Sequence, residues 1–173
     1  IELVPYLDDG TRLASVNLEI NPGATRVVAS SDLFPVQPVS HFGICGSSSV
    51  SVTAAYRSTA ASSTSAHVPE ITRYGRKFLF YPGEWDVVYE GMAAINLGAG
   101  ASRIEAILLS EKGEELRRTV LNPALPAYAK QLAVLDWEFR GLHGAVIRIE
   151  SSQPLVILFL RGTRPDASTA LLY

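Results

Sequence analysis

The chain has 173 residues, of which 47% are hydrophobic and 18% charged, and its formal net charge is −2. This apolar composition excludes a disordered chain, and the 13 glycines and 10 prolines argue against a helical bundle. The near-neutral charge gives no electrostatic signature of nucleic-acid binding or of an anionic membrane surface. A single cysteine, Cys45, excludes an internal disulfide framework and a cysteine-based metal cluster. No run of about 18 apolar residues exists, so no membrane span is expected.

Short runs of β-branched and aromatic residues between turn residues predict an all-β chain. We expect a hairpin of residues 1–7 and 11–20 about Asp8-Asp9-Gly10, since this glycine accepts the positive φ of a tight turn. A strand follows at 25–29, then a loop at 30–40 and two strands within 41–58, broken at 46–49. The Ser/Thr/Ala-rich residues 58–66 predict a mobile loop. Because the chain begins inside a strand-like run without Met or signal peptide, we expect a mature or excised piece.

The second half has the same pattern with larger apolar residues. A strand at 77–81 ends at Pro82-Gly83, and a long strand is predicted for 85–96. A hairpin of 103–110 and 114–121 turns at Gly113, and residues 127–135 are of mixed character, with a short helix as one reading. Strands at 145–150 and 155–161 flank residues 151–154, and a last strand covers 168–173.

The two halves repeat one order of features, first at an offset of 103 residues and then at 104. We interpret this as a duplication, the alternative being that two all-β halves share turn spacings. The prediction is two tandem antiparallel β-sandwich modules, Ig-like or jelly-roll-like, at residues 1–69 and 70–173. The aligned pairs are Ile1/Ile104, Glu2/Glu105, Gly10/Gly113, Leu13/Leu116, Pro22/Pro126, Asp32/Asp136, Val52/Val156, Arg57/Arg161, Thr59/Thr163 and Ala66/Ala170.

The first module then lacks its N-terminal strands, because it has no counterpart of residues 77–102, which form two strands of the second. Missing strands expose sheet edges, which proteins normally cover. Three alternatives remain for what covers the exposed edges of the first module. Residues upstream of Ile1 would supply the strands, another chain would donate them by β-augmentation, or the two copies would merge into one continuous sandwich.

The second module carries a series of structural residues that resembles tandem β-sandwich repeats of about 100 residues, found in secreted and surface proteins of bacteria. The resemblance is weaker in the first module, where Ser49-Val50 replaces Gln153-Pro154 and Ala54-Ala55 replaces Leu158-Phe159. It implies a stalk, adhesion or matrix-forming role rather than catalysis. The residues that carry it are Trp85, Gly91-Met-Ala-Ala-Ile-Asn96-Leu-Gly98, Gly113, Pro126, Gly144, Ile149-Glu-Ser-Ser152-Gln-Pro154 and Leu160-Arg161-Gly162.

Candidate reactive groups are few and each has a structural interpretation. The three histidines, His41, His67 and His143, lack the spacing of a metal site. Cys45 lies in a glycine-flanked turn, and it or a serine of residues 47–49 would need a histidine to act as a nucleophile, so a small buried cysteine is expected instead.

Charged clusters are interpreted as solvated features. Asp8-Asp9 and the acidic set at the second hairpin tip are expected to be exposed turns rather than a calcium site or an acid–base pair. The short basic set falls in the predicted linker beside Tyr74 and predicts a solvated joint or a contact with a neighbour, not a nucleic-acid site. The acidic set is Glu111, Glu114 and Glu115, and the basic set is Arg73, Arg76 and Lys77.

Aromatic residues of the second module offer the one ligand-binding hypothesis. Trp85 and Tyr89, four positions apart on the predicted strand, share a face, and with Trp137 and Tyr81 they would suit stacking against sugar rings. The alternative is that they lie in the core or at a module interface.

The sequence therefore predicts a non-enzymatic structural or adhesive module outside the cell or on its surface, without metal or cofactor. Its expected partners are other modules or copies of itself, joined through strands or edges. The alternative is a carbohydrate-binding module that uses Trp85, Tyr89 and Trp137.

Overall fold

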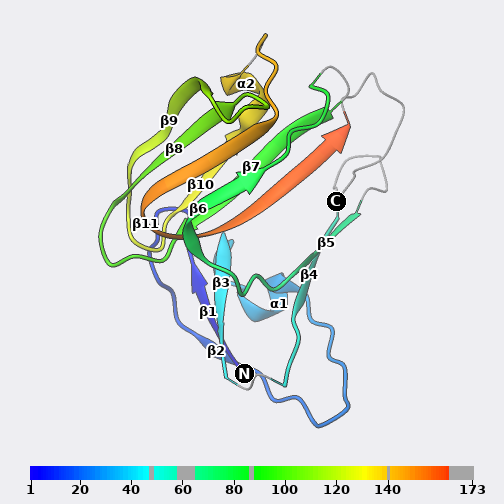
Figure 1. The fold of residues 1–173 in the computed structure, drawn as a ribbon. Helices are drawn as coiled ribbons and strands as arrows, with labels where there is room; N and C mark the ends of the chain where they lie inside the picture. The colour runs from blue at the N-terminus through cyan, green and yellow to red at the C-terminus, as the bar shows by residue number, and fades with distance from the viewer. Residues whose placement is uncertain (47–48, 58–64, 86–87, 140, 164–173) are drawn as a thin grey trace.

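The computed structural model describes residues 1–46, 49–57, 65–85, 88–139 and 141–163, and Figure 1 shows its fold. Its elements are antiparallel strands in three sheets and two helices of one turn each, so the predicted all-β class is confirmed. Residues 1–69 contain β1 (Glu2–Tyr6), β2 (Val16–Asn17), α1 (Ser30–Leu33), β3 (His41–Cys45), β4 (Thr53–Arg57) and β5 (Ser65–Pro69). Residues 70–173 contain β6 (Gly75–Phe80), β7 (Val88–Asn96), β8 (Ser102–Leu109), β9 (Glu115–Leu125), β10 (Lys130–Val134), α2 (Leu135–Glu138) and β11 (Val146–Thr163).

The second half, residues 70–173, forms one six-stranded sheet organised around β11. This strand of 18 residues pairs with β8 along its first part and with β7 along its second. β6 lies on the opposite side of β11 from β8, because residues 147–150 pair with both strands. The sheet curls where β11 passes from β8 to β7, as the orange ribbon shows in Figure 1.

The core of the molecule lies inside this curled sheet. β7 alternates buried and outward residues, the pattern of a strand with one face on a core, whereas β8 alternates only as far as Ala106 and is buried on both faces from there to Leu109. Phe139, directly after α2, is fully buried and closes the core at one end. The buried apolar residues are Met92, Ala94, Ile104, Ala106, Leu108, Leu125, Ala129, Leu135, Phe139, Ile147, Ile149, Leu155 and Ile157.

The first half, residues 1–69, is thinly packed by comparison. Its strands form a three-stranded sheet in the order β2-β1-β3 and a separate β4-β5 pair. Among the described residues before β7, only Leu3, Val4 and Pro5 are buried. Figure 1 shows these small sheets below the six-stranded sheet, and β1 runs toward it.

Several predicted elements need correction. The run 11–20 keeps only the two residues of β2, and residues 25–29 form no strand. In the predicted repeat, residues 25–29 correspond to β10. β10 forms a strand because it pairs with β7, whereas the described part of the first half has no strand equivalent to β7. The predicted loop at 30–40 contains α1, and residues 65–69 form β5.

In the second half, the mixed segment 127–135 is mainly β10, followed by α2 rather than containing it. The predicted strands at 145–150 and 155–161 are one continuous β11, and β7 begins at Val88 rather than at Trp85. The predicted strand at 168–173 and most of the predicted loop at 58–66 lie outside the described residues. In the described part of the chain, no helix has the length and apolar character to cross a membrane.

Candidate functional site

The first candidate site for association is the open edge of β3. We use this name for the side of His41–Cys45 that faces away from β1, its one strand partner in the described structure. Phe42 and Ile44 are only half-buried on this strand. Backbone N–H and C=O groups along such an edge are free to pair with another strand.

A joint between the two halves lies at the end of β1. The carboxylate of Asp8 accepts a hydrogen bond from the Ser40 hydroxyl at 2.6 Å and lies 2.9 Å from the ammonium of Lys130. The backbone N–H of Lys130 also donates to the carbonyl of Asp8 at 2.9 Å. The hydrogen bond from Ser40, together with Lys130, lowers the pKa of Asp8. Asp8 is exposed, as predicted for this turn, and it also makes a structural contact between the halves.

An aromatic stack stands beside this ion pair. The ring of Tyr6 lies between those of His41 and Tyr128, with centroids 5.3 Å from each. Nδ1 of His41 is 3.1 Å from the Ser40 hydroxyl. Burial, and then the charge of Lys130, lower the pKa of His41, so the ring is neutral at pH 7.

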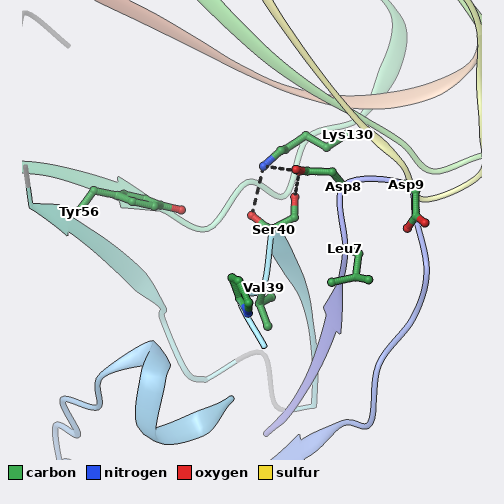
Figure 2. A pocket seen from close by; sticks show the side chains of 8 residues that line it. Leu7, Asp8, Asp9, Val39, Ser40, Tyr56 and Lys130 are labelled. Carbon is green, nitrogen blue, oxygen red and sulfur yellow. Dashed lines mark hydrogen bonds and ion pairs between the residues drawn. The ribbon is translucent and has the colours of Figure 1, made fainter. Parts of the chain in front are cut away.

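A cleft of about 640 Å³ opens next to the joint. Figure 2 shows Asp8, Ser40 and Lys130 bonded to one another at its wall, with Tyr56 on the far side. Because these polar groups form their hydrogen bonds and ion pair with one another, this wall joins the two halves. It offers few polar groups to a ligand. The lining residues are Leu7, Asp8, Asp9, Pro38, Val39, Ser40, Tyr56 and Lys130.

A buried ion pair fastens the other end of the six-stranded sheet. Glu90, 0% exposed, accepts hydrogen bonds from Nε of Arg161 at 2.8 Å and from the backbone N–H of Gly83 at 2.7 Å. Arg161 in turn donates to the carbonyl of Tyr81 at 2.6 Å. Desolvation raises the pKa of Glu90 despite these bonds, and the nearby Asp136 adds to the rise. The pair holds the segment before β7 against β7 and β11.

The predicted aromatic platform is divided in the structure. Trp85 lies before β7, not on it, and its ring stacks on the buried Phe139 with centroids 6.2 Å apart. Tyr89 is on β7 and lies over Gly162, where a Cβ would overlap its ring. Trp137 on α2 is 68% exposed. The shared strand face expected for Trp85 and Tyr89 is therefore wrong, because Trp85 packs against the core.

The other candidates lie apart from one another. Cys45 is exposed rather than buried, and His41 contacts Ser40 and Tyr6. His67 on β5 and His143 after α2 are exposed. Within the described ranges, no group of three or more His, Cys, Asp or Glu side chains is placed to hold a metal ion. Ser47 and Ser48 lie outside the described residues.

One member of each predicted charged set, Glu115 and Lys77, belongs to an ion-pair network on the outer face of the six-stranded sheet. Arg118 links three strands, because it pairs with Glu105 at 2.9 Å and Glu115 at 2.7 Å and lies 3.7 Å from Glu150. Lys77 of the predicted basic set lies 3.5 Å from Glu150. Sequence reasoning missed this network, the Asp8 joint and the Glu90 pair, although the alignment of Arg57 with Arg161 marked one partner.

Comparisons with protein-family models, with curated proteins and with solved structures found no match.

Proposed function

We propose that this chain is a non-enzymatic structural or adhesive module of the extracellular space or cell surface. In this proposal its two halves are copies of one β-sandwich module. Among the described residues the first copy has no counterpart of β6 and β7, and it associates with neighbouring modules or copies through the open edge of β3. The observation that carries the proposal is this unpaired edge in a half of the chain with only three described buried residues.

Strand pairing supports the duplication. The β1–β2 pair Glu2↔Asn17, moved by 103 residues, becomes the β8–β9 pair Glu105↔Val120. The isolated bridge between Tyr6 and Arg12 becomes Leu109↔Glu115 in the same way.

The β1–β3 pairing extends the agreement to a third strand. With β1 moved by 103 and β3 by 105, all five of its residue pairs coincide with pairs of β8 and β11, such as Leu3↔Ile44 with Ala106↔Ile149. The shift of 105 also carries α1 onto α2, so for these segments the offset of 104 read from the sequence is one residue short. Similar turn spacing by itself does not produce the same register in two pairings.

The distribution of charge favours association through an edge rather than a face. The outer face of the six-stranded sheet carries the Arg118 network of ion pairs and is well solvated. In the described part of the first half β3 has a strand on one side only, and few residues are buried, so a further strand would extend its sheet and its core.

Sedimentation velocity of the full chain, from low micromolar to submillimolar concentration, tests this proposal. We expect concentration-dependent association that Ile44→Lys abolishes, because an inward-pointing charge at an edge blocks strand addition. Val27→Lys is the matched control, since Val27 is 93% exposed and lies off the edge. Circular dichroism establishes that each variant is folded. A wild-type chain that stays monomeric throughout would contradict self-association.

A further inference from the structure

We infer that the open edge of β3 takes an antiparallel strand of the β6 type, with aromatic residues at alternate positions, from a neighbouring module of the same kind. This inference rests on the proposed function, and it names the partner segment and its register. The second half of the chain supplies the template for both.

In the second half, the edge equivalent to that of β3 is occupied. β11 pairs with β8 on one side and with β6 on the other, in the register Ile147↔Phe80 and Ile149↔Phe78. Phe78 and Phe80 pack against the core there, and Ile147 and Ile149 are both 0% exposed. Their equivalents on β3, Phe42 and Ile44, have no such strand beside them among the residues that the structure describes, and both are only half-buried.

The edge of β3 also lacks the protection that edge strands usually carry. Natural edges are guarded by charged residues, proline or a bulge. The edge strands β6, β9 and β10 carry charged residues, including Lys77, Arg117 and Lys130. β3 has the sequence His-Phe-Gly-Ile-Cys, regular pairing with β1, and neither a lysine nor a proline. An unguarded apolar edge of this kind suits a strand partner.

The template fixes which residues meet. Since Glu150 pairs with Lys77 in the second half, a strand bound in the same register places its Lys77 position opposite Cys45. Phe78 and Phe80 then lie opposite Ile44 and Phe42, on the core side. Cys45 is exposed and is the one cysteine of the chain, so it reports the register without any change to the protein.

Disulfide formation with a synthetic peptide of residues 73–82 tests the register. Two peptides are compared, one with Lys77→Cys and one with Phe78→Cys. Each is incubated with the full chain in a buffer of reduced and oxidised glutathione, in which oxidised glutathione is the oxidant, and is followed by intact mass. We expect the Lys77→Cys peptide to form the mixed disulfide several-fold faster, because neighbouring positions on a strand point to opposite faces. Excess unmodified peptide should remove the difference, and so should urea. Equal rates, or a faster Phe78→Cys peptide, would overturn the inference.

A fused chain provides a second measurement that does not depend on peptide solubility. An extra copy of residues 74–103 placed directly before Ile1 supplies the strand within the chain, since Ile104 aligns with Ile1. With Lys77→Cys in the extra copy alone, the fused chain should form an intramolecular disulfide between this cysteine and Cys45. It should also show slower amide exchange in residues 41–45 than the original chain. Association sensitive to Ile44→Lys, but without this disulfide or this register, would leave the proposed function standing and refute the inference alone.

Discussion

Gly10 lies against the backbone of Ala127 and its neighbours, so the first hairpin turn meets the turn before β10 without a side chain between them. A Cβ at Gly10 would overlap the carbonyl oxygen of Ala127 and lie 2.7 Å from the nitrogen of Ala129. Gly10 also has φ +89°, a value that favours glycine. This approach brings Asp8 to Lys130 and so holds the two halves together.

Gly10→Ala should therefore cost more stability than Gly113→Ala. Gly113 has φ +80° at the equivalent turn but no atom within 4 Å of an added Cβ. The control, Gly113→Ala, should lose only the stability that corresponds to backbone strain, about 1–2 kcal/mol. Gly10→Ala adds the overlap, and we expect faster amide exchange at Lys130 as the joint opens. Equal unfolding free energies and equal exchange for the two variants would contradict this role of Gly10.

His41 should make the joint sensitive to acid. Because burial lowers the pKa of His41 below its ordinary value of 6.5, the stability it contributes is complete above that value and is lost as the pH falls toward the folded-state pKa. Wild type should lose stability between about pH 7.5 and about pH 5.5 in urea titrations. His41→Phe, which keeps a ring beside Tyr6, should lose less. Variant His143→Gln is the control and should behave as wild type.

Loss of the ion pair between Glu90 and Arg161 should lower the unfolding free energy by an amount that depends on pH. The dependence is opposite in sense to that of His41. Arg161→Met leaves a fully buried carboxylate without its cation, which costs about 3–5 kcal/mol at pH 7. The pKa of Glu90 is already raised, so the variant should recover stability as the pH falls and this carboxyl takes up a proton. Glu90→Gln should cost less, about 1 kcal/mol, since its amide oxygen can still accept the Gly83 N–H. Denaturant unfolding at several pH values measures both.

Asn96 should be a stability determinant of the corner between β7 and β8. Its side chain is 0% exposed, donates to the carbonyls of Gly100, Leu125 and Pro126, and accepts from the N–H of Gly98. Asn96→Ala leaves these buried groups unpaired and should cost about 2–4 kcal/mol. Asn122→Ala, on a partly exposed contact with Gln131, is the control and should cost under about 1 kcal/mol in the same unfolding assay.

The sugar-binding hypothesis now has a sharper test. Trp85→Ala should lower stability by about 2 kcal/mol because its ring packs on Phe139. Trp137→Ala should change stability by less than about 0.5 kcal/mol because Trp137 is exposed. A glycan array with wild type and Trp137→Ala separates the two effects. Binding that wild type shows and Trp137→Ala loses would support a sugar site at α2. An array on which wild type gives no signal would contradict the sugar-binding hypothesis.

The regular strands could be predicted from the sequence because their signal is local. β8 and β3 have apolar runs bounded by turn residues, and the Gly113 hairpin follows from its turn chemistry. Residues 25–29 show the limit of this reasoning. Val27 and Val28 have strand propensity, yet a strand needs a partner, and Val27 is 93% exposed.

The sites were harder to predict because they join distant residues. Asp8 and Lys130 are 122 positions apart in sequence, and neither position looks unusual in its own segment. Glu90 falls at a core-facing position of β7, which is a signal for a buried charge, but only the fold brings Arg161 to it. An alignment of the chain with itself predicts exposed sheet edges in the first half without knowledge of contacts, but it does not say which strand carries such an edge.

The central place of β11 has a consequence for the order in which the protein folds. β6, β7 and β8 all pair with a strand that begins at Val146, so a ribosome has made the residues up to there before this shared partner exists. The β8–β9 hairpin can form early from local contacts, whereas β6 must wait through about 70 further residues of synthesis. During that interval the aromatic residues of β6 are exposed on the nascent chain, in the state in which a neighbouring β3 could capture them.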